Sequence, residues 1–331
     1  MQNINTVTGI SVVIPNYNGK NLLEKNLPLV FSALKASGVA YEVIVADDAS
    51  ADGSVDFISQ QYPEIILIKS EKNGGFATNI NKGISAAKLD LVLMLNSDIK
   101  LSEEYFITQL RYFAIADTFG VMAQIRDEES DEVVEACKYP RQSFFKINHL
   151  KNVAFDKGGN IYTYYLSGAN ALVNREKLLE LGGFNELFSP FYHEDLDLSL
   201  RAWENGWKCY YEHDAVCWHA ISTTIKAHSS KKRIKTISTR NRLLLHYFHL
   251  RGIRLYLWAF ITFLSLVVKW ISGKLYYYKA YLLFIKLIPA MHSYKQRFIT
   301  TAVAKRQYIP FITVKENIIK VLDQTFKMQQ K

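Results

Sequence analysis

Four short apolar runs, rich in β-branched residues, recur in the first hundred residues, and segments long enough for one helix each separate them. The runs are Ile10–Ile14, Val43–Ala46, Ile65–Ile68 and Leu91–Leu95, and the helical segments are Lys20–Ser37, Ser54–Gln61 and Ala77–Lys88. Strands that alternate with helices form parallel sheets covered on both faces. We therefore predict an α/β fold with a mostly parallel central sheet, whose ligands bind at the carboxyl ends of the strands.

The charge of the chain changes sign near residue 225. Residues 1–225 contain 19 Lys and Arg against 29 Asp and Glu, whereas residues 226–331 contain 21 against 2. The two regions therefore carry net charges of −10 and +19. Such asymmetry indicates an anionic partner for the basic region, either nucleic acid or a membrane surface. We predict two regions, a ligand-binding body over 1–225 and a basic helical region over 226–331.

Polar residues follow the first two predicted strands. The first strand ends in Pro15, Asn16, Tyr17 and Asn18, and the second ends in Asp47 and Asp48. Neither end is a GxGxxG loop, which argues against an ordinary dinucleotide site. Carboxylates here can accept hydrogen bonds from a nucleoside, and Tyr17 can stack on its base. The alternative is that Asp47 and Asp48 only cap the next helix, and the pattern alone does not separate the two.

The third predicted strand is followed by a loop rich in glycine and amides, Asn73–Gly83. Gly74 permits unusual backbone angles, while Asn79 and Asn81 offer hydrogen bonds near a helix start, where anionic groups are favoured. The loop is a candidate phosphate or sugar contact, although an ordinary turn and cap would have the same composition.

The fourth strand, Leu91–Leu95, is followed at once by Asn96, Ser97 and Asp98. A carboxylate at the end of a buried strand suits Mg²⁺ or Mn²⁺, because hard cations prefer oxygen ligands and phosphate can supply the rest. An amide stands at 96, where a second acid would strengthen the site. We therefore expect Asp98 to need a further ligand from elsewhere in the chain.

Five motifs occur in order between about residues 10 and 220. They are Ser11–Asn18 (SVVIPNYN), Val43–Ser54 (VIVADDASADGS), Asn73–Gly83 (NGGFATNINKG), Leu93–Asp98 (LMLNSD) and His193–Arg201 (HEDLDLSLR). Together they resemble the large bacterial family two of inverting glycosyltransferases, which have the GT-A fold and use nucleotide sugars, especially rhamnosyltransferase-like enzymes of cell-surface polysaccharide assembly. The resemblance implies a Rossmann-like GT-A catalytic domain over 1–225 with hexosyl- or rhamnosyltransferase activity, and UDP or dTDP sugars as the leading donors.

The resemblance also implies roles for single residues. Residues that match Pro15, Tyr17, Asp47 and Asp48 line the nucleoside pocket of such enzymes, and the carboxylate that matches Asp98 binds the metal. The full set of donor-site candidates is Pro15, Tyr17, Asn18, Asp47, Asp48, Asn73, Gly74, Asn79, Asn81, Asn96 and Ser97. In related transferases a histidine after the acidic motif completes the metal site, and His219 stands at that point. A lone histidine is otherwise more often structural.

An acceptor hydroxyl is a poor nucleophile until a base removes its proton. By resemblance Asp195 is that base, with Glu194 as its neighbour, and adjacent acids can raise each other's pKa. Asp197 and Arg201 stand four residues apart in the predicted helix, and we interpret them as a structural ion pair.

The acceptor side of the site is implied by the segment Ser167–Val173, which looks like the strand that borders the acceptor in this family. Its small residues leave room for a sugar, although tight packing of the strand would select the same residues. Aromatic residues that precede the acidic motif could flank a sugar ring. The acceptor-binding candidates are Asn170, Tyr192 and His193.

Two apolar runs of the basic region, Leu255–Val268 and Ala280–Ile285, are each shorter than the roughly 20 residues needed to span a bilayer. Trp, Tyr and Lys residues around them are typical of helices in a membrane interface. We predict peripheral or monotopic association with an anionic membrane; a re-entrant hairpin, a single tilted span and a soluble helical hairpin are the alternatives. The basic run Ser229–Arg242 could be a lid over the donor phosphates or a membrane-facing segment.

Other functions explain less of the chain. A basic nucleic-acid-binding protein would account for the charge of residues 226–331 but not for the motifs, so we expect no nucleic-acid partner. A metal-dependent nucleotidyltransferase would need a glycine- and basic-rich triphosphate loop near the first strand, and the sequence has no such loop there. The residues Met1–Gly9 show no secretory signal, and the three cysteines form no disulfide framework. We expect a location on the cytoplasmic face of the inner membrane and a glycan or lipid-linked acceptor.

Overall fold

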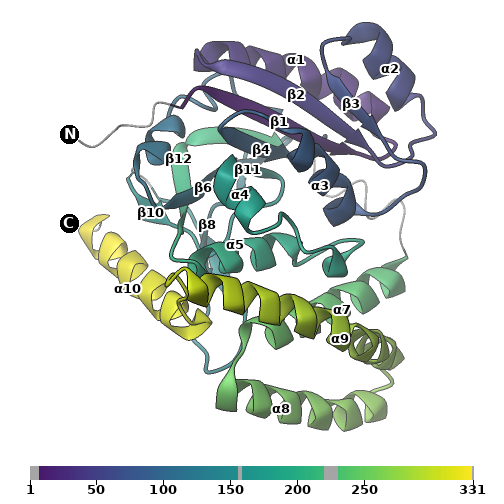
Figure 1. Ribbon diagram of the computed structural model, residues 1–331, viewed down its shortest axis with the longest axis vertical. Helices are drawn as coiled ribbons and strands as arrows, with labels where there is room; N and C mark the ends of the chain where they lie inside the picture. Colours follow the sequence, from purple (N-terminus) through teal and green to yellow (C-terminus); the bar gives the residue numbers. More distant parts are fainter. Residues whose placement is uncertain (1–6, 156–158, 220–229, 330–331) are drawn as a thin grey trace.

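The computed structural model describes residues 7–155, 159–219 and 230–329. Within them, one ten-stranded sheet lies at the centre, and helices cover both of its faces (Figure 1). The strands are β1 (Gly9–Asn16), β2 (Ala40–Asp47), β3 (Ile66–Lys69), β4 (Leu91–Leu95), β5 (Ile99–Leu101), β6 (Thr118–Asp127), β7 (Val133–Glu135), β8 (Cys137–Pro140), β9 (His149–Val153), β10 (Ile161–Tyr162), β11 (Asn170–Asn174) and β12 (Lys208–His219), of which β8 and β9 form a separate pair. The helices are α1 (Lys20–Ser37), α2 (Ser54–Gln61), α3 (Phe76–Ala86), α4 (Arg175–Glu180), α5 (Glu194–Glu204), α7 (Lys231–His249), α8 (Gly252–Ile271), α9 (Leu275–Ala304) and α10 (Phe311–Gln329), with 3-10 turns η1 (Leu110–Ala114) and η2 (Glu186–Phe188). The predicted α/β class is confirmed.

The strand order of the sheet is β10-β12-β6-β11-β4-β1-β2-β3, with β5 beside β12 and β7 beside β6. β1 is parallel to β2 and β4, and β3 is parallel to β2. β11 is antiparallel to both β4 and β6, so this half of the sheet is mixed. The carboxyl ends of β1 to β4 therefore lie along one edge, where the polar motifs follow.

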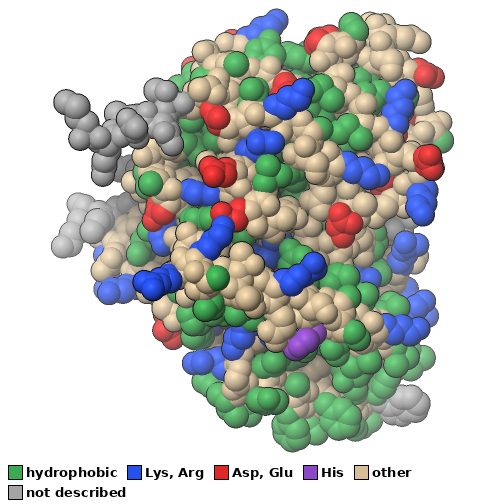
Figure 2. Space-filling model, viewed as in Figure 1, with side chains coloured by type: hydrophobic (Ala, Val, Ile, Leu, Met, Phe, Trp, Pro, Cys, Tyr) green, Lys and Arg blue, Asp and Glu red, His purple; other side chains and the backbone are tan. Residues whose placement is uncertain are grey.

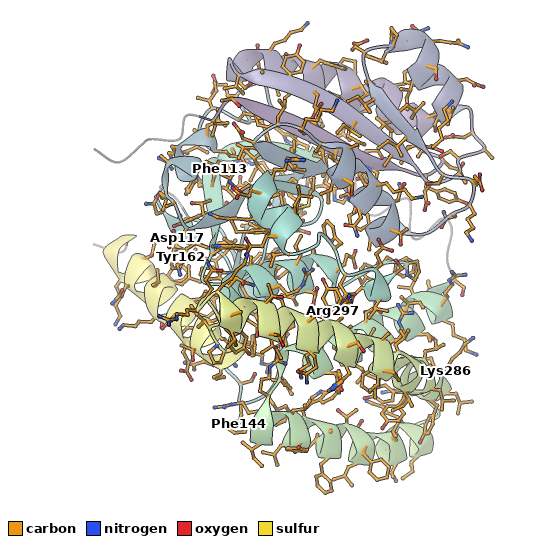
Figure 3. The ribbon with its side chains drawn as sticks, viewed as in Figure 1. Phe113, Asp117, Phe144, Tyr162, Lys286 and Arg297 are labelled. Carbon is orange, nitrogen blue, oxygen red and sulfur yellow. The ribbon has the colours of Figure 1, made fainter. Side chains whose placement is uncertain are left out.

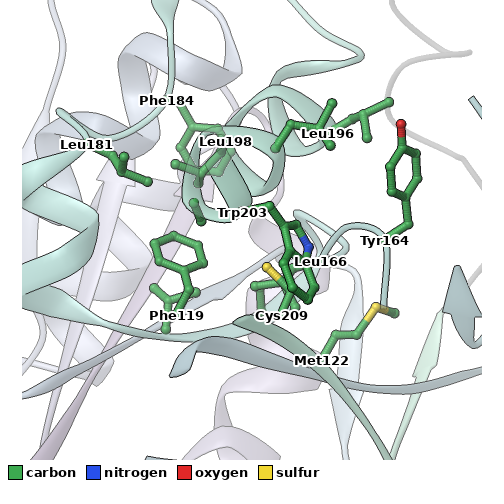
Figure 4. Close-up of a cluster of buried hydrophobic side chains, with 14 of the residues drawn as sticks. Phe119, Met122, Tyr164, Leu166, Leu181, Phe184, Leu196, Leu198, Trp203 and Cys209 are labelled. Carbon is green, nitrogen blue, oxygen red and sulfur yellow. The ribbon is translucent and has the colours of Figure 1, made fainter. Parts of the chain in front are cut away.

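Alternate residues of β1 enter two different hydrophobic clusters. Val13 packs in the cluster of α3 and α5, whereas Val12 and Ile14 pack in the cluster of α1. Side chains of a strand point alternately to its two faces, so a strand covered on both faces must be apolar throughout. Figure 4 shows part of the first cluster, in which Leu196 and Trp203 of α5 belong to the core.

The predicted bounds of α1 and α2 match the structure, and α3 begins one residue before its predicted start. Gly38 ends α1 with a φ of 73°, a left-handed conformation that glycine adopts without steric cost. β1 and β2 extend beyond the predicted runs because their parallel pairing continues through Asn16 and Asp47. That extension places both polar residues at the end of the paired region.

The helices of the basic region share the core of the body. Leu244 of α7, Phe284 of α9 and Ile318 of α10 belong to the same cluster as Val13. The change at residue 225 is therefore a change of charge and not a boundary between two separate cores in the described parts of the chain. The predicted basic run begins at Ser229, which lies outside the described residues, and continues as the first turns of α7.

A network of fully buried charged side chains joins α5 to α7. Arg201 Nε donates to Asp197 Oδ2 at 2.8 Å, which confirms the predicted structural ion pair. His249 of α7 lies 3.2 Å from Asp197 and 2.8 Å from Glu204. Although burial raises it, the pKa of Asp197 is lowered overall by the Arg201 and His249 partners. The first helix of the basic region is thus fastened to the helix of the acidic motif.

α8 is the most exposed helix of this region. It lies at the lower end of the molecule in Figure 1, where Figure 2 shows hydrophobic side chains gathered. Its exposed apolar residues are Ile253, Tyr256, Leu257, Phe260, Ile261, Phe263, Leu264, Val267, Val268 and Ile271. The apolar run was expected to be too short to span a bilayer, but the helix continues through Arg254 and Lys269 to 20 residues. By length and composition alone, α8 is sufficient to cross a membrane.

Candidate active site

Strand pairing brings the two predicted metal ligands together. β5 follows Asp98 directly and pairs antiparallel with the end of β12, so that His219 lies opposite Ile99. His219 Nε2 is 3.1 Å from Asp98 Oδ2. Although burial lowers it, the pKa of His219 is raised because Asp98 accepts its hydrogen bond and contributes negative charge. The other oxygen, Asp98 Oδ1, is buried and has no hydrogen-bond partner among the residues that the structure describes.

Asp98 and His219 supply two of the ligands that a divalent cation needs. An unpartnered carboxylate oxygen beside an imidazole is a suitable donor set for Mn²⁺ or Mg²⁺. No group of three or more His, Cys, Asp or Glu side chains suited to a metal occurs in the described parts of the chain. Asn96, the neighbouring amide, donates its backbone N–H to Ala169 at 3.0 Å. Asp98 and His219 are therefore two protein donors of the described chain that could hold such a cation.

Hydrogen bonds join the end of β1 to the end of β2 and to the turn that follows β2. Asp47 accepts from Asn16 Nδ2 at 2.8 Å and from the Ser50 backbone N–H at 2.9 Å. Asn18 has a φ of 51°, and its Oδ1 accepts from the Ala51 N–H at 2.8 Å. Pro15 pairs with Ala46 inside the sheet, while Tyr17 is exposed. Asp47 is buried and shapes the turn after β2, but it does not cap the next helix, because Gly53 is the N-cap of α2 and no side chain caps that helix.

Asp48 orders the glycine loop. Its two carboxylate oxygens accept from the backbone N–H groups of Gly74 at 2.8 Å and Gly75 at 2.9 Å. Gly75 has a φ of 84°, and a Cβ there would lie 2.9 Å from Pro190 Cα. Only glycine avoids both the backbone strain and that clash. Asn73 is exposed at the start of this loop.

The two amides of α3 make contacts within the protein. Asn79 is buried and donates to the Ala46 carbonyl at 2.6 Å. Asn81 exchanges hydrogen bonds with both backbone groups of Phe184 at 2.9 Å. These bonds hold α3 on β2 and on the turn after α4. We leave Asn79 and Asn81 out of the donor contacts proposed below, because Asn79 is buried against β2 and the amide of Asn81 is bonded to Phe184.

The acidic motif starts α5 beside the beginning of β11. Asp195 accepts backbone hydrogen bonds from Leu196 and Gly168, and a Cβ on Gly168 would lie 3.4 Å from Asp195 Cβ. Burial raises the pKa of Asp195 to about 6, a rise to which the charge of Glu135 contributes. Burial and the neighbouring Asp195 raise the pKa of Glu194 to about 8. These two carboxyl groups titrate in the range that a general base at neutral pH requires.

The acceptor candidates are placed differently from one another. Tyr192 is exposed and has a φ of 76°, and His193 follows with a φ of 73°. Burial, followed by the charge of Arg242, lowers the pKa of His193 to about 4. Asn170 has no exposed surface, and its Nδ2 donates to the Ala123 carbonyl at 3.2 Å. Because the sheet encloses Asn170, we leave it out of the acceptor contacts proposed below.

The remaining candidates meet at one edge of the sheet. A Cβ on Gly19 would lie 3.3 Å from Ser97 Oγ, which places the end of β1 beside the end of β4. Asn96 bonds to Ala169, the neighbour of Gly168, and Gly168 contacts Asp195. The glycine loop contacts Pro190, just before the acidic motif. The strand ends, the Asp98 and His219 pair and the two carboxyl groups are thus connected through contacts of the residues next to them in the chain.

Sequence reasoning did not identify four residues near this site. Glu135 of β7 and Lys138 of β8, which form a 2.9 Å ion pair, act on the pKa of Asp195. Arg240 and Asn241 of α7 hydrogen-bond to the loop before Glu194. Glu135 and Lys138 lie on short strands that carry no motif. Arg240 and Asn241 lie in a segment whose only distinctive sequence feature is its positive charge. No local signal distinguishes them.

Solved structures with this fold include complexes with UDP and with UDP-GlcNAc. S. aureus TarS 1-349 in complex with UDP-GlcNAc matches with a TM-score of 0.56 and 16% identity, over 96% of this chain and 92% of that one. GalNAc-T7 with UDP, GalNAc and Mn²⁺ matches with a TM-score of 0.60 and 14% identity, over 76% of this chain and 49% of that one. At these identities the similarity shows the GT-A fold alone.

Sequence comparison connects the chain to a family. Chondroitin synthase of Escherichia coli is 22% identical over 233 residues, which are 62% of this chain and 33% of that protein. The chain spans about a third to a half of the length of the curated relatives it matches first. The family model of the glycosyltransferase like family 2 matches residues 8–238. This match covers well over half of the chain, so the protein belongs to the glycosyltransferase like family 2.

Proposed function

We propose that the protein is an inverting glycosyltransferase, which moves a sugar from a nucleoside-diphosphate sugar to a hydroxyl group of a glycan or lipid-linked acceptor in cell-surface polysaccharide synthesis. The observation that carries the proposal is the carboxyl pair Glu194 and Asp195, which contacts through Gly168, Ala169 and Asn96 connect to the strand-end pair Asp98 and His219. Product analysis tests it. A glycosyltransferase releases nucleoside diphosphate and a glycosylated acceptor, whereas a nucleotidyltransferase releases pyrophosphate.

In this proposal Asp195 removes the proton of the acceptor hydroxyl. The hydroxyl oxygen attacks the anomeric carbon in line with the bond to the diphosphate, that bond breaks, and the configuration inverts. Glu194, whose pKa is about 8, keeps its proton at neutral pH and can donate a hydrogen bond to the acceptor. Exposed Tyr192 and neutral His193 border the acceptor.

We assign the donor nucleoside to the ends of β1, β2 and β4. Exposed Tyr17 offers a ring for stacking on the base, and the turns held by Asp47 and Asp48 present the backbone around it. Donor contacts in this proposal come from Pro15, Tyr17, Asn18, Asp47, Asp48, Asn73, Gly74, Asn96 and Ser97. We propose a UDP or dTDP sugar as donor and a hexosyl or rhamnosyl group as the sugar transferred.

We propose that Asp98 and His219 hold a divalent cation, Mn²⁺ or Mg²⁺. A cation there would offset the charge of the leaving nucleoside diphosphate. Support comes from the unpartnered Asp98 Oδ1 and from the position of both side chains at the edge to which we assign the donor.

Asp98→Asn is expected to remove the effect of Mn²⁺ on nucleotide binding. If Mn²⁺ bridges the protein and the diphosphate, it tightens UDP or dTDP binding to the wild type, and we expect this gain to fall by at least about tenfold in the variant. Titration calorimetry with and without Mn²⁺ measures the gain. Asp214→Asn removes an equal charge from an exposed position of β12 and is the control. An unchanged gain in Asp98→Asn would contradict the metal assignment.

We propose that α8 rests in the interface of an anionic membrane at the cytoplasmic face. The helix is covered with exposed apolar side chains, and the region around it holds 21 Lys and Arg against 2 acids. Figure 3 shows the side chains of α8 projecting away from the body, and Arg254 lies 4.7 Å from the ring of Phe144 at the start of the helix. Apolar burial combined with attraction to anionic lipid is typical of interfacial helices.

Replacing three exposed side chains of α8, Phe260, Phe263 and Val267, by serine is expected to lower vesicle binding by at least about tenfold, because each loses apolar area that the bilayer would bury. Cosedimentation with vesicles of phosphatidylcholine and phosphatidylglycerol measures the effect. The matched control replaces the exposed Ile107, Val133 and Leu179 of the body by serine. Equal binding by both triple variants would exclude α8 as the docking surface.

A further inference from the structure

The loop before the acidic motif is held by an asparagine of α7. Asn241 has no exposed surface, and its Nδ2 lies 2.5 Å from the Phe188 carbonyl oxygen and 2.9 Å from those of Phe191 and Tyr192. One amide group has only two hydrogens, so the three carbonyls share them. Such convergence on one side chain fixes the path of the loop between Phe188 and His193.

The neighbouring residue reinforces this contact. Arg240 donates from Nε and Nη2 to Asn241 Oδ1, at 2.8 and 2.6 Å, and from Nη2 to the carbonyls of Phe188 and Ser189. Its side chain is largely buried, and no carboxylate of the described residues forms an ion pair with it. Burying a cation against neutral acceptors is costly. This arrangement is therefore poorly explained by a contribution to stability alone.

The opposite side of the loop rests on the donor side of the site. The Phe76 N–H donates to the Pro190 carbonyl at 3.1 Å, and Gly75 packs against Pro190. Tyr192 and His193 both have positive φ angles, which non-glycine residues keep only where surrounding contacts enforce them. The loop from Phe188 to His193 is thus held between the glycine loop and α7, and Glu194 and Asp195 follow it directly. We call its contacts with Arg240 and Asn241 the clamp.

We propose that Arg240 and Asn241 are positioning residues, which hold the loop from Phe188 to His193 so that Glu194 and Asp195 face the reacting sugar. The inference rests on the proposed transfer of a sugar by this site. A base displaced by about 1 Å loses on the order of a hundredfold in rate, even when binding is unchanged. The basic region would then act on the chemistry through α7, in addition to any contact with a membrane.

Asn241→Leu is the sharpest test, because it keeps the number and branching of the side-chain atoms, removes the donor that the three carbonyls share and adds no charge. We expect kcat to fall by roughly a hundredfold while the dissociation constant for UDP or dTDP changes by less than about twofold. We also expect the acidic limb of the pH profile to move down, because a displaced Asp195 is more solvated. Charged groups that act on Asp195 from the elements around it are Glu135, Lys138 and Glu194, and none is altered.

Two further variants keep the test decisive. Leu244→Ala removes a fully buried side chain of the same helix and is the control for lost stability. Arg240 lies nearer the surface than Asn241, so Arg240→Gln tests the same loop contacts if Asn241→Leu does not fold. An equal fall of kcat in Leu244→Ala, or an unmoved pH profile in the folded clamp variants, would overturn the positioning role.

Hydrogen exchange separates this inference from the proposed function. Loss of the clamp is expected to speed amide exchange in residues 188–197 and to leave α1 and β1 unaffected. If the wild type transfers no sugar, the proposed function fails, and unchanged exchange in both clamp variants independently refutes the clamp.

Discussion

Asp195→Asn is expected to lower kcat for sugar transfer by about 10²–10⁴-fold, because an amide cannot accept the proton of the acceptor hydroxyl. The substitution keeps the shape of the side chain and the oxygen that accepts from Leu196 and Gly168. Affinity for the donor nucleotide should therefore change by less than about twofold. Steady-state transfer assays and equilibrium binding of UDP or dTDP measure the two quantities on the same preparation.

The pH dependence of the wild type provides an independent check. Below its pKa of about 6, Asp195 is protonated and cannot act as a base, so activity should fall about tenfold for each pH unit below that value. Glu194→Gln should be less damaging than Asp195→Asn at pH 7, because Glu194 already carries its proton there. Asp56→Asn, at an exposed position of α2, is the charge control. Near-normal turnover of Asp195→Asn would reject Asp195 as the base.

Stability distinguishes a chemical defect from unfolding in this variant. The carboxyl group of Asp195 has a raised pKa in the folded protein, so the unfolded chain loses its proton first as the pH rises. Folding stability therefore falls between the ordinary pKa of an aspartate and pH 6, and the penalty is fully present at pH 7. Asp195→Asn removes it, so its melting temperature should equal or exceed that of the wild type.

Arg201→Met is expected to lower the free energy of unfolding by about 3–5 kcal/mol, because it leaves Asp197 buried without its main counter-charge. The carbonyl oxygens of Leu181 and Gly183 also lose the donors that now reach them at 2.8 and 2.9 Å. Guanidinium denaturation at pH 7, followed by circular dichroism, measures the change.

A matched pair shows whether burial is the cause. Lys20 and Glu24 have the same spacing of four residues, and their charged groups are 3.7 Å apart with both side chains exposed. Lys20→Met should change the free energy of unfolding by no more than about 0.5 kcal/mol, because water screens such pairs. If Arg201→Met cost as little, the network between α5 and α7 would not stabilise the fold.

Much of the sheet and of its edge was predictable from the sequence. The strand β4 has its predicted bounds, and the polar residues that follow β1, β2 and β4 lie at one edge because parallel strands end there together. Both ends of α1 and the start of α2 were predictable for a local reason, since Gly19, Gly38 and Gly53 stand next to them. Asp98 and His219 were linked by resemblance, and the pairing of β5 with β12 is what brings them within 3.1 Å.

The sequence by itself determined the alternation of strands and helices, the motifs at the strand ends and the separation of charge, because these depend on residues near one another in the chain. Only the tertiary structure decided which polar side chains are available for a substrate. Asn79 and Asn170 have the composition of ligands, but α3 and the sheet enclose them. A role for Arg240 and Asn241 could be inferred only from the packing of α7 beside the loop that precedes Glu194. Hydrogen-bond partners of buried groups are set by packing between distant segments, and local sequence patterns carry no information about that packing.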